Sequence, residues 1–110
     1  MAWFRRTDSV PRSDRTTAEA VAGVRFSTTS FREGYDMEDV DAFLEACVET
    51  LRWLEGGVRP AAPLTMKQVR DARFGQTKFR SGYDQGEVDD LLDQVAATLY
   101  DAEAARDSTS

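Results

Sequence analysis

Apolar side chains recur along two stretches of the chain with the spacing of a helix that buries one face. In both stretches the intervals are four, three, four and three residues, and the second stretch lies 48 positions after the first. This spacing is typical of the seam of a short coiled coil. Phe43, Val48, Leu91 and Ala96 widen the stripe, so each helix can bury a second flank against a short helix or another chain. The seam positions are Val40, Leu44, Cys47, Leu51 and Leu54, and then Val88, Leu92, Val95, Leu99 and Ala102.

The stripe belongs to a unit that the chain contains twice. Residues 17–51 align with residues 65–99 without a gap, and fifteen of the 35 pairs are identical, which is far above chance. Each unit begins with a threonine, Thr17 or Thr65, that can cap a short helix before a loop and a longer helix. We therefore divide the chain into a flexible N-terminus (1–16), a first repeat (17–54), a linker (55–64), a second repeat (65–103) and a disordered tail (104–110).

The start of each long helix is marked by the motifs FREGYD and FRSGYD. In the first motif, Gly34 permits a positive φ just before the helix. Asp36 is the expected N-cap, and Asp39 stands three residues later as a carboxylate version of the capping box. Tyr35 and Val40 occupy the two positions that pack together in a hydrophobic staple. The corresponding residues of the second unit are Gly82, Tyr83, Asp84, Glu87 and Val88.

These signals predict an all-α fold of two repeats, each with a short helix, a loop and a long helix. Helices of about 17 to 20 residues need tertiary packing to be stable, so the long helices should form a short coiled-coil-like pair. The ten linker residues, EGGVRPAAPL, reach roughly 33 Å when extended, which suffices to return along a helix of about 27 Å. A parallel pseudo-dimer is therefore favoured. An antiparallel pair, and pairing between two chains, stay open.

Composition restricts the chemistry. The net charge of −6 argues against a nucleic acid partner, because such binding depends on neutralising phosphates. The chain has no histidine and a single cysteine, Cys47, which we place in the seam as a small buried hydrophobe. Helix capping and solvation explain the carboxylate pairs Asp39/Asp41 and Asp89/Asp90. We therefore expect no enzyme, no small-molecule substrate, no cofactor and no metal site. The chain has no apolar run of roughly 20 residues, so we expect a cytoplasmic protein.

Charge is distributed unevenly along each repeat. Residues 25–32 and 73–80 hold two and three basic side chains and no acidic ones, whereas residues 36–54 hold six acids and one arginine. Phe31 and Phe79, each followed by an arginine, are not needed to start a helix, and both membrane or partner contact and ordinary core packing stay open for them. Phe26 and Phe74 are expected to pack inside. MAWFRR, at residues 1–6, is a second candidate anchor, but we favour a disordered terminus for this segment. The candidate membrane or partner contacts are Phe31, Arg32, Phe79, Arg80, Arg25, Arg73 and Lys78.

The two motifs, FR-x-GYD-x-x-x-VD, resemble the N-terminal domain of the DivIVA-type cell-division and polar-growth proteins of bacteria. The resemblance covers roughly two thirds of the chain. It implies a parallel helical dimer whose loops bind a membrane through an exposed phenylalanine and the basic residue after it. By position these residues are Phe31 and Arg32, and Phe79 and Arg80. The chain departs from the family pattern in having two copies without a long coiled coil after them, like the short DivIVA-domain proteins of actinobacteria.

From these observations we expect a non-enzymatic, peripheral membrane and cell-division-site binding module at the inner face of the cell membrane. Its expected partners are an anionic membrane surface and cell-division or polar-growth proteins, and a homodimer stays open. The alternative is a soluble helical interaction adaptor, or a homodimerising module without membrane contact, that uses the widened helix flank. Exposure of Phe31 and Phe79 at the same end of the molecule would favour the membrane hypothesis.

Overall fold

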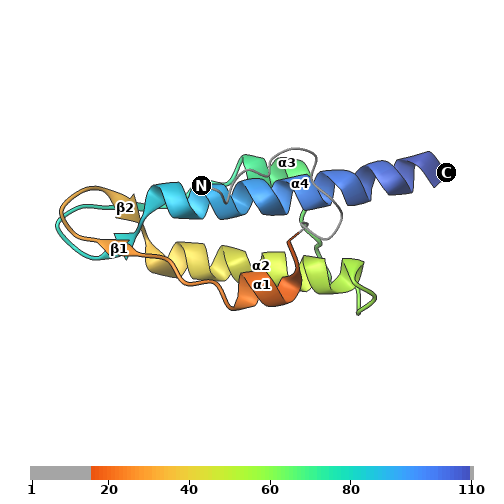
Figure 1. Cartoon of the computed structure of the whole chain (residues 1–110), viewed down its shortest axis with the longest axis horizontal. Helices are drawn as coiled ribbons and strands as arrows, with labels where there is room; N and C mark the ends of the chain where they lie inside the picture. Colours follow the sequence, from red (N-terminus) through yellow and green to blue (C-terminus); the bar gives the residue numbers. More distant parts are fainter. Residues whose placement is uncertain (1–15, 110) are drawn as a thin grey trace, which may run out of the picture.

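The computed structural model describes residues 16–109 (Figure 1), and the candidate anchor MAWFRR lies outside these residues. Each repeat contains a short helix, two short strands and a long helix in that order. The first repeat contains α1 (Ala18–Ala22), β1 (Thr28–Thr29), β2 (Gly34–Tyr35) and α2 (Met37–Leu54). The second contains α3 (Met66–Arg70), β3 (Gln76–Thr77), β4 (Gly82–Tyr83) and α4 (Gln85–Thr109).

The expected all-α fold is wrong, because the loop segments pair into a four-stranded antiparallel sheet with the order β1-β4-β2-β3. The outer pairs join the two repeats: Thr28 stands opposite Tyr83, and Gln76 stands opposite Tyr35. The two pairings are equivalent, because Thr28 and Gln76 occupy the same position in their repeats, as do Tyr35 and Tyr83. The central pair places Tyr35 opposite Tyr83. A strand of two residues has no readable alternation of polar and apolar positions, so periodicity could not have revealed it.

Both long helices begin at the sheet and run away from it in the same direction (Figure 1). Their facing side chains form one buried cluster, because the apolar seam of each helix is the surface that water must leave. Val40, Cys47, Val88 and Val95 are completely buried. Burial raises the pKa of the Cys47 thiol to about 12, so this side chain stays protonated and packs as a small apolar group.

The short helices lie along the long helix of their own repeat, α1 on α2 and α3 on α4. Thr17 caps α1 by accepting a hydrogen bond from the Ala20 N–H, and Thr65 forms a capping box with Gln68. The backbone N–H of the first residue of each short helix donates to a glutamate near the C-terminal end of the long helix. Glu55 accepts from the Ala18 N–H at 2.8 Å, and Glu103 accepts from the Met66 N–H at 2.8 Å.

The chain segments before the two short helices cross to the opposite repeat. The Thr16 N–H donates to Thr98 Oγ1 on α4, and the Leu64 N–H donates to Thr50 Oγ1 on α2. The linker (55–64) thus ends against the helix that it left. In the linker the Arg59 guanidinium lies 5.2 Å from the centre of the Trp53 ring. At the other end of the chain, α4 continues past residue 103, where we placed the end of the second repeat, as far as Thr109.

Candidate functional site

The sheet is the base of the candidate site, and the two central tyrosines tie the repeats together there. The Tyr35 hydroxyl donates to Asp89 Oδ1 on α4 at 2.9 Å, and the Tyr83 hydroxyl donates to Asp41 Oδ1 on α2 at 2.9 Å. Burial, and then the hydrogen bond to the neighbouring carboxylate, raises the pKa of each tyrosine above its ordinary value. Each hydroxyl therefore stays protonated and acts as the donor.

The rings of the same tyrosines pack on phenylalanines of the opposite repeat. Tyr83 lies 5.1 Å from Phe26 and Tyr35 lies 5.2 Å from Phe74, between ring centres, and both pairs are tilted. Phe74 also meets Phe43 of α2 edge to face at 5.7 Å. Phe26 and Phe74 are half-buried against the core, in the interior position that we expected for them. Aromatic pairs of this geometry add to the free energy gained from burial alone.

The capping box expected at the start of each long helix does not form. Asp36 accepts a hydrogen bond from the Asp39 N–H, as an N-cap should, but the Asp39 carboxylate accepts from the Gly75 N–H of the other repeat. The Asp36 N–H donates to the Gly75 carbonyl at 2.7 Å. Asp84, Glu87 and Ser27 make the corresponding contacts on the other side. Each helix start is therefore completed by the opposite repeat.

The glycines of the two motifs are required by close packing and not by the positive φ that we expected. Among the described residues, Gly56 is the glycine with a positive φ. A Cβ on Gly34 would lie 2.8 Å from the Tyr83 carbonyl oxygen, and a Cβ on Gly82 would collide with the Thr77 side chain. Glycine is thus needed where the two inner strands approach each other.

Arg32 and Arg80 are paired with the N-cap aspartates of the opposite repeat. Arg32 Nη2 lies 2.6 Å from Asp84 Oδ2, and Arg80 Nη2 lies 3.4 Å from Asp36 Oδ2. Backbone N–H groups in the first turn of each helix, followed by these arginines, lower the pKa of both carboxyl groups below the ordinary value. The arginine side chains stay 70% and 63% exposed, so each can still reach a further anion.

The two phenylalanines at the loop tips have no place in the core. Phe31 is 96% exposed and Phe79 is 82% exposed. Both stand in loops that leave the same end of the sheet, opposite to the C-terminal end of α4 (Figure 1). The two loops touch, because Ser30 Oγ and Ser81 Oγ lie 3.5 Å apart. Phe79 has a φ of 67°, which is unusual for a bulky side chain and is found where the surroundings fix a strained backbone.

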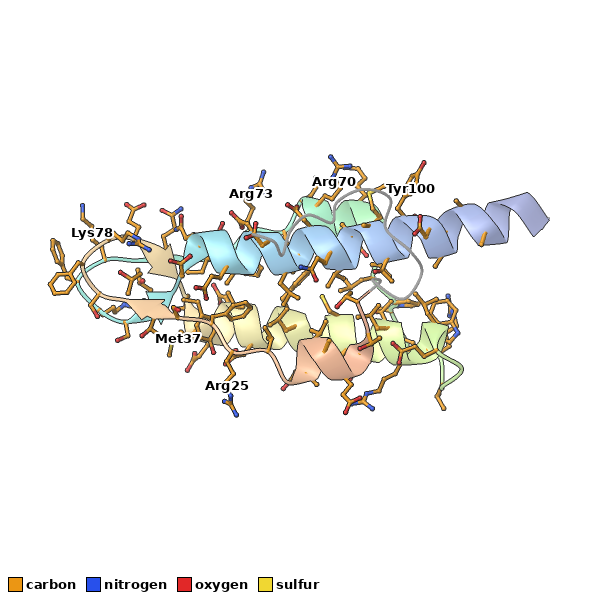
Figure 2. All side chains as sticks on the ribbon, in the orientation of Figure 1. Arg25, Met37, Arg70, Arg73, Lys78 and Tyr100 are labelled. Carbon is orange, nitrogen blue, oxygen red and sulfur yellow. The ribbon has the colours of Figure 1, made fainter. Side chains whose placement is uncertain are left out.

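Lys78 stands at the loop end of the molecule (Figure 2). Its Nζ lies 5.6 Å from the centre of the Phe79 ring, and no ion pair is found for it among the described residues. Phe31, Arg32, Glu33 and Lys78 line a shallow hollow of about 500 Å³ that continues to the start of α4. The tip therefore combines two apolar side chains with a cation that has no ion pair in the part of the chain that the structure describes.

Arg25 and Arg73, which we expected to contact the membrane or a partner together with the tip residues, lie behind the tip (Figure 2). Figure 2 shows them pointing away from opposite sides of the molecule. Arg73 donates to the carbonyls of Asp71 and Ala72 in its own loop. The structure brings together Phe31, Arg32, Lys78, Phe79 and Arg80, and it leaves Arg25 and Arg73 outside this group. The sequence alone could not distinguish the tip residues from these two arginines, because the direction in which a loop side chain points is set only when the chain folds.

The widened helix flank that supported the adaptor alternative is used inside the molecule. Leu91 and Ala96 are buried, and Phe43 and Val48 are half-buried against the core. The described residues contain no group of three or more His, Cys, Asp or Glu side chains that could hold a metal ion.

Comparison of this chain with family models, with curated proteins and with solved structures finds no match. Among the described residues, no helix has both the length and the apolar character needed to cross a bilayer.

Proposed function

We propose that this chain is a tandem relative of the DivIVA N-terminal domain and a peripheral membrane-binding module of the cell-division site, located at the inner face of the cell membrane. The observation that carries the proposal is the exposure of Phe31 and Phe79 on two touching loops at one end of the molecule. Exposed, adjacent aromatic side chains on loops are a common way to meet a lipid surface or a partner. The DivIVA resemblance favours the lipid surface.

The energetics fit reversible binding. Burying one phenylalanine side chain in an apolar phase gains roughly 1.5 to 3 kcal/mol, so a single loop would bind weakly. The two loops are held in contact, so the second insertion takes place at a high effective concentration once the first has occurred. Two tips facing the same way are therefore worth much more than one.

Cations have a supporting part in this proposal. Lys78 would contribute about 1 kcal/mol near an anionic surface. Arg32 and Arg80 already face Asp84 and Asp36, so their first task is to hold the loops on the sheet. Headgroup contacts by their exposed faces are secondary. The tip is thus less basic in effect than the count of arginines in the sequence suggests.

Co-sedimentation with phosphatidylglycerol-containing vesicles tests the proposal. The Phe31→Ser, Phe79→Ser double variant should lower the affinity at least about a hundredfold, since the two side chains together contribute roughly 3 kcal/mol or more. Val58→Ser with Tyr100→Ser is the matched control, because these side chains are 89% and 59% exposed but lie in the linker and on the outer part of α4. The control should bind like the wild type.

Equal pelleting of the double variant and the wild type would refute the proposal.

Lys78→Ala should reduce binding about fivefold at low salt and less at high salt, because screening weakens its attraction to the lipid headgroups.

A further inference from the structure

A pair of equivalent grooves runs beside the stem, one in each repeat. The α1–α2 groove has a volume of about 480 Å³, and the α3–α4 groove has a volume of about 510 Å³. Each is closed at the sheet end by the central tyrosine of the other repeat. Most of their lining residues correspond when 48 is added to the residue number, as with Val21 and Val69, Phe26 and Phe74, and Leu44 and Leu92.

The α1–α2 groove has an apolar floor and an acidic wall. Its floor is formed by side chains of both helices and of the loop after α1, namely Val21, Val24, Phe26, Leu44 and Val48. Its wall is formed by Asp41, Glu45 and Glu49, which stand four residues apart on one face of α2. No ion pair is found for Glu45 or Glu49 among the described residues. Like charges at this spacing repel each other and weaken a helix, so a bound cation would relieve them.

The α3–α4 groove has lost this character. Arg70 replaces Ala22 in its lining, and Ala97 stands where the first repeat has Glu49. An arginine that the first repeat lacks at this position thus accompanies the two carboxylates, Asp89 and Asp93. The repeat fold does not require the complete acidic wall, since the second repeat keeps two of the three carboxylates and has Ala97 in place of Glu49. The negative charge of the α1–α2 groove is therefore the better match for a positively charged partner.

We infer that the α1–α2 groove docks a peptide segment of a partner protein that presents a bulky apolar side chain between arginines. The apolar side chain would occupy the floor beside Val21 and Val48, and the arginines would pair with Glu45 and Glu49. A carboxylate row is matched by the planar, multidentate guanidinium group. A second copy of this chain fits poorly, because its own stem carries the same excess of acids. The inference is independent of the membrane contact at the tip.

Titration of the ¹⁵N-labelled full chain with the capped peptide RRLFRR, followed by NMR, tests the inference. The amide signals of Val21, Val48 and Glu49 should move, and those of Val69, Ala96 and Ala97 should move much less. The peptide EELFEE should leave both grooves unchanged. Binding of RRLFRR should weaken as salt is added, because the contacting charges are exposed. A titration of the Arg5→Ser, Arg6→Ser variant excludes competition by these two arginines, which follow Trp3 and Phe4 in the chain.

Two double variants with the same change in net charge locate the contact. Glu45→Gln with Glu49→Gln should weaken RRLFRR binding roughly five- to tenfold, the range expected for two exposed ion pairs. Asp90→Asn with Asp93→Asn, on α4, should change it less than about twofold by the same reasoning. Ala22→Arg with Glu49→Ala gives the first groove the charges of the second and should abolish binding. Circular dichroism melting verifies that each variant is folded.

Three results would overturn the inference. One is that RRLFRR and EELFEE bind alike. Another is that both grooves respond equally to RRLFRR. The third is that neither the wild type nor the Arg5→Ser, Arg6→Ser variant binds RRLFRR.

Discussion

The sheet end and the stem hold the two repeats together by different means. At the sheet end the contacts are polar and reciprocal: strands pair across the repeats, and each tyrosine hydroxyl reaches a carboxylate of the other repeat. In the stem the shared element is an apolar seam, and each short helix packs on its own long helix. The seam supplies most of the stability, because apolar burial is the dominant favourable contribution to folding. The sheet end fixes which surfaces meet, because its hydrogen bonds are directional.

The largest effect is expected in the stem. Leu51 is 1% exposed, so Leu51→Ala should leave a cavity and lower the free energy of unfolding by about 3 kcal/mol. Urea denaturation measures this loss. Val58→Ala, at an 89% exposed linker position, is the control and should change it by less than about 0.5 kcal/mol. A loss below about 1 kcal/mol at Leu51 would mean that the seam is not the main source of stability.

A smaller effect is expected at the sheet. Gly82→Ala places a Cβ against the Thr77 side chain and 2.9 Å from the Tyr35 carbonyl oxygen, so the strands must move apart at a cost of about 2 kcal/mol. Gly86→Ala is the matched control, because Gly86 lies in α4 with its nearest contact at 3.4 Å. Alanine there should stabilise the helix by up to about 1 kcal/mol. Equal unfolding midpoints for the two variants would show that the strands do not need to approach so closely.

The smallest effect concerns the charges that close the tip. The pKa values of Asp36 and Asp84 are lowered in the folded state, so their contribution to stability is fully present above the ordinary value of 3.8. It is lost as the pH falls through the lower folded-state values. Asparagine keeps the capping oxygen without the charge. The Asp36→Asn, Asp84→Asn variant should therefore melt a few degrees below the wild type at pH 7.

Thermal melts between pH 2 and pH 7 test the sign of this effect. The difference between wild type and variant should begin to shrink below the ordinary pKa of aspartate and approach zero below the lowered folded-state values, where the wild-type carboxyl groups are protonated in the folded chain too. A difference that stays constant with pH would show that the Arg32–Asp84 and Arg80–Asp36 pairs contribute nothing.

Local signals in the sequence predicted the local parts of the structure. Thr17, Thr65 and Asp36 cap their helices as expected, and the seam residues Val40 and Val88 are completely buried. These features depend on residues within four positions of each other, which is the range that helix spacing and capping rules describe. The end of the first long helix at Leu54, before two glycines, followed from the same rules.

Contacts between the repeats were the part that local rules could not predict. Asp39 was expected to bond within its own helix start, and it bonds to Gly75, 36 positions away. The strands could not be predicted for the same reason, since each strand pairs with a strand of the other repeat. The acidic wall of the α1–α2 groove was also missed. Its signal was present in the four-residue spacing of Asp41, Glu45 and Glu49 beside the apolar stripe.

The linker (55–64) has a genetic consequence. In a dimer of identical chains, one codon change alters both faces of the assembly, so a gain on one side must be tolerated on the other. Here both halves are translated as one polypeptide, and a single codon can change one side alone. Ala22 and Arg70, or Glu49 and Ala97, show that equivalent positions have already diverged. Because the linker joins the two halves in one polypeptide, mutations can change the surface of one half without changing the other, while the sheet holds both halves together.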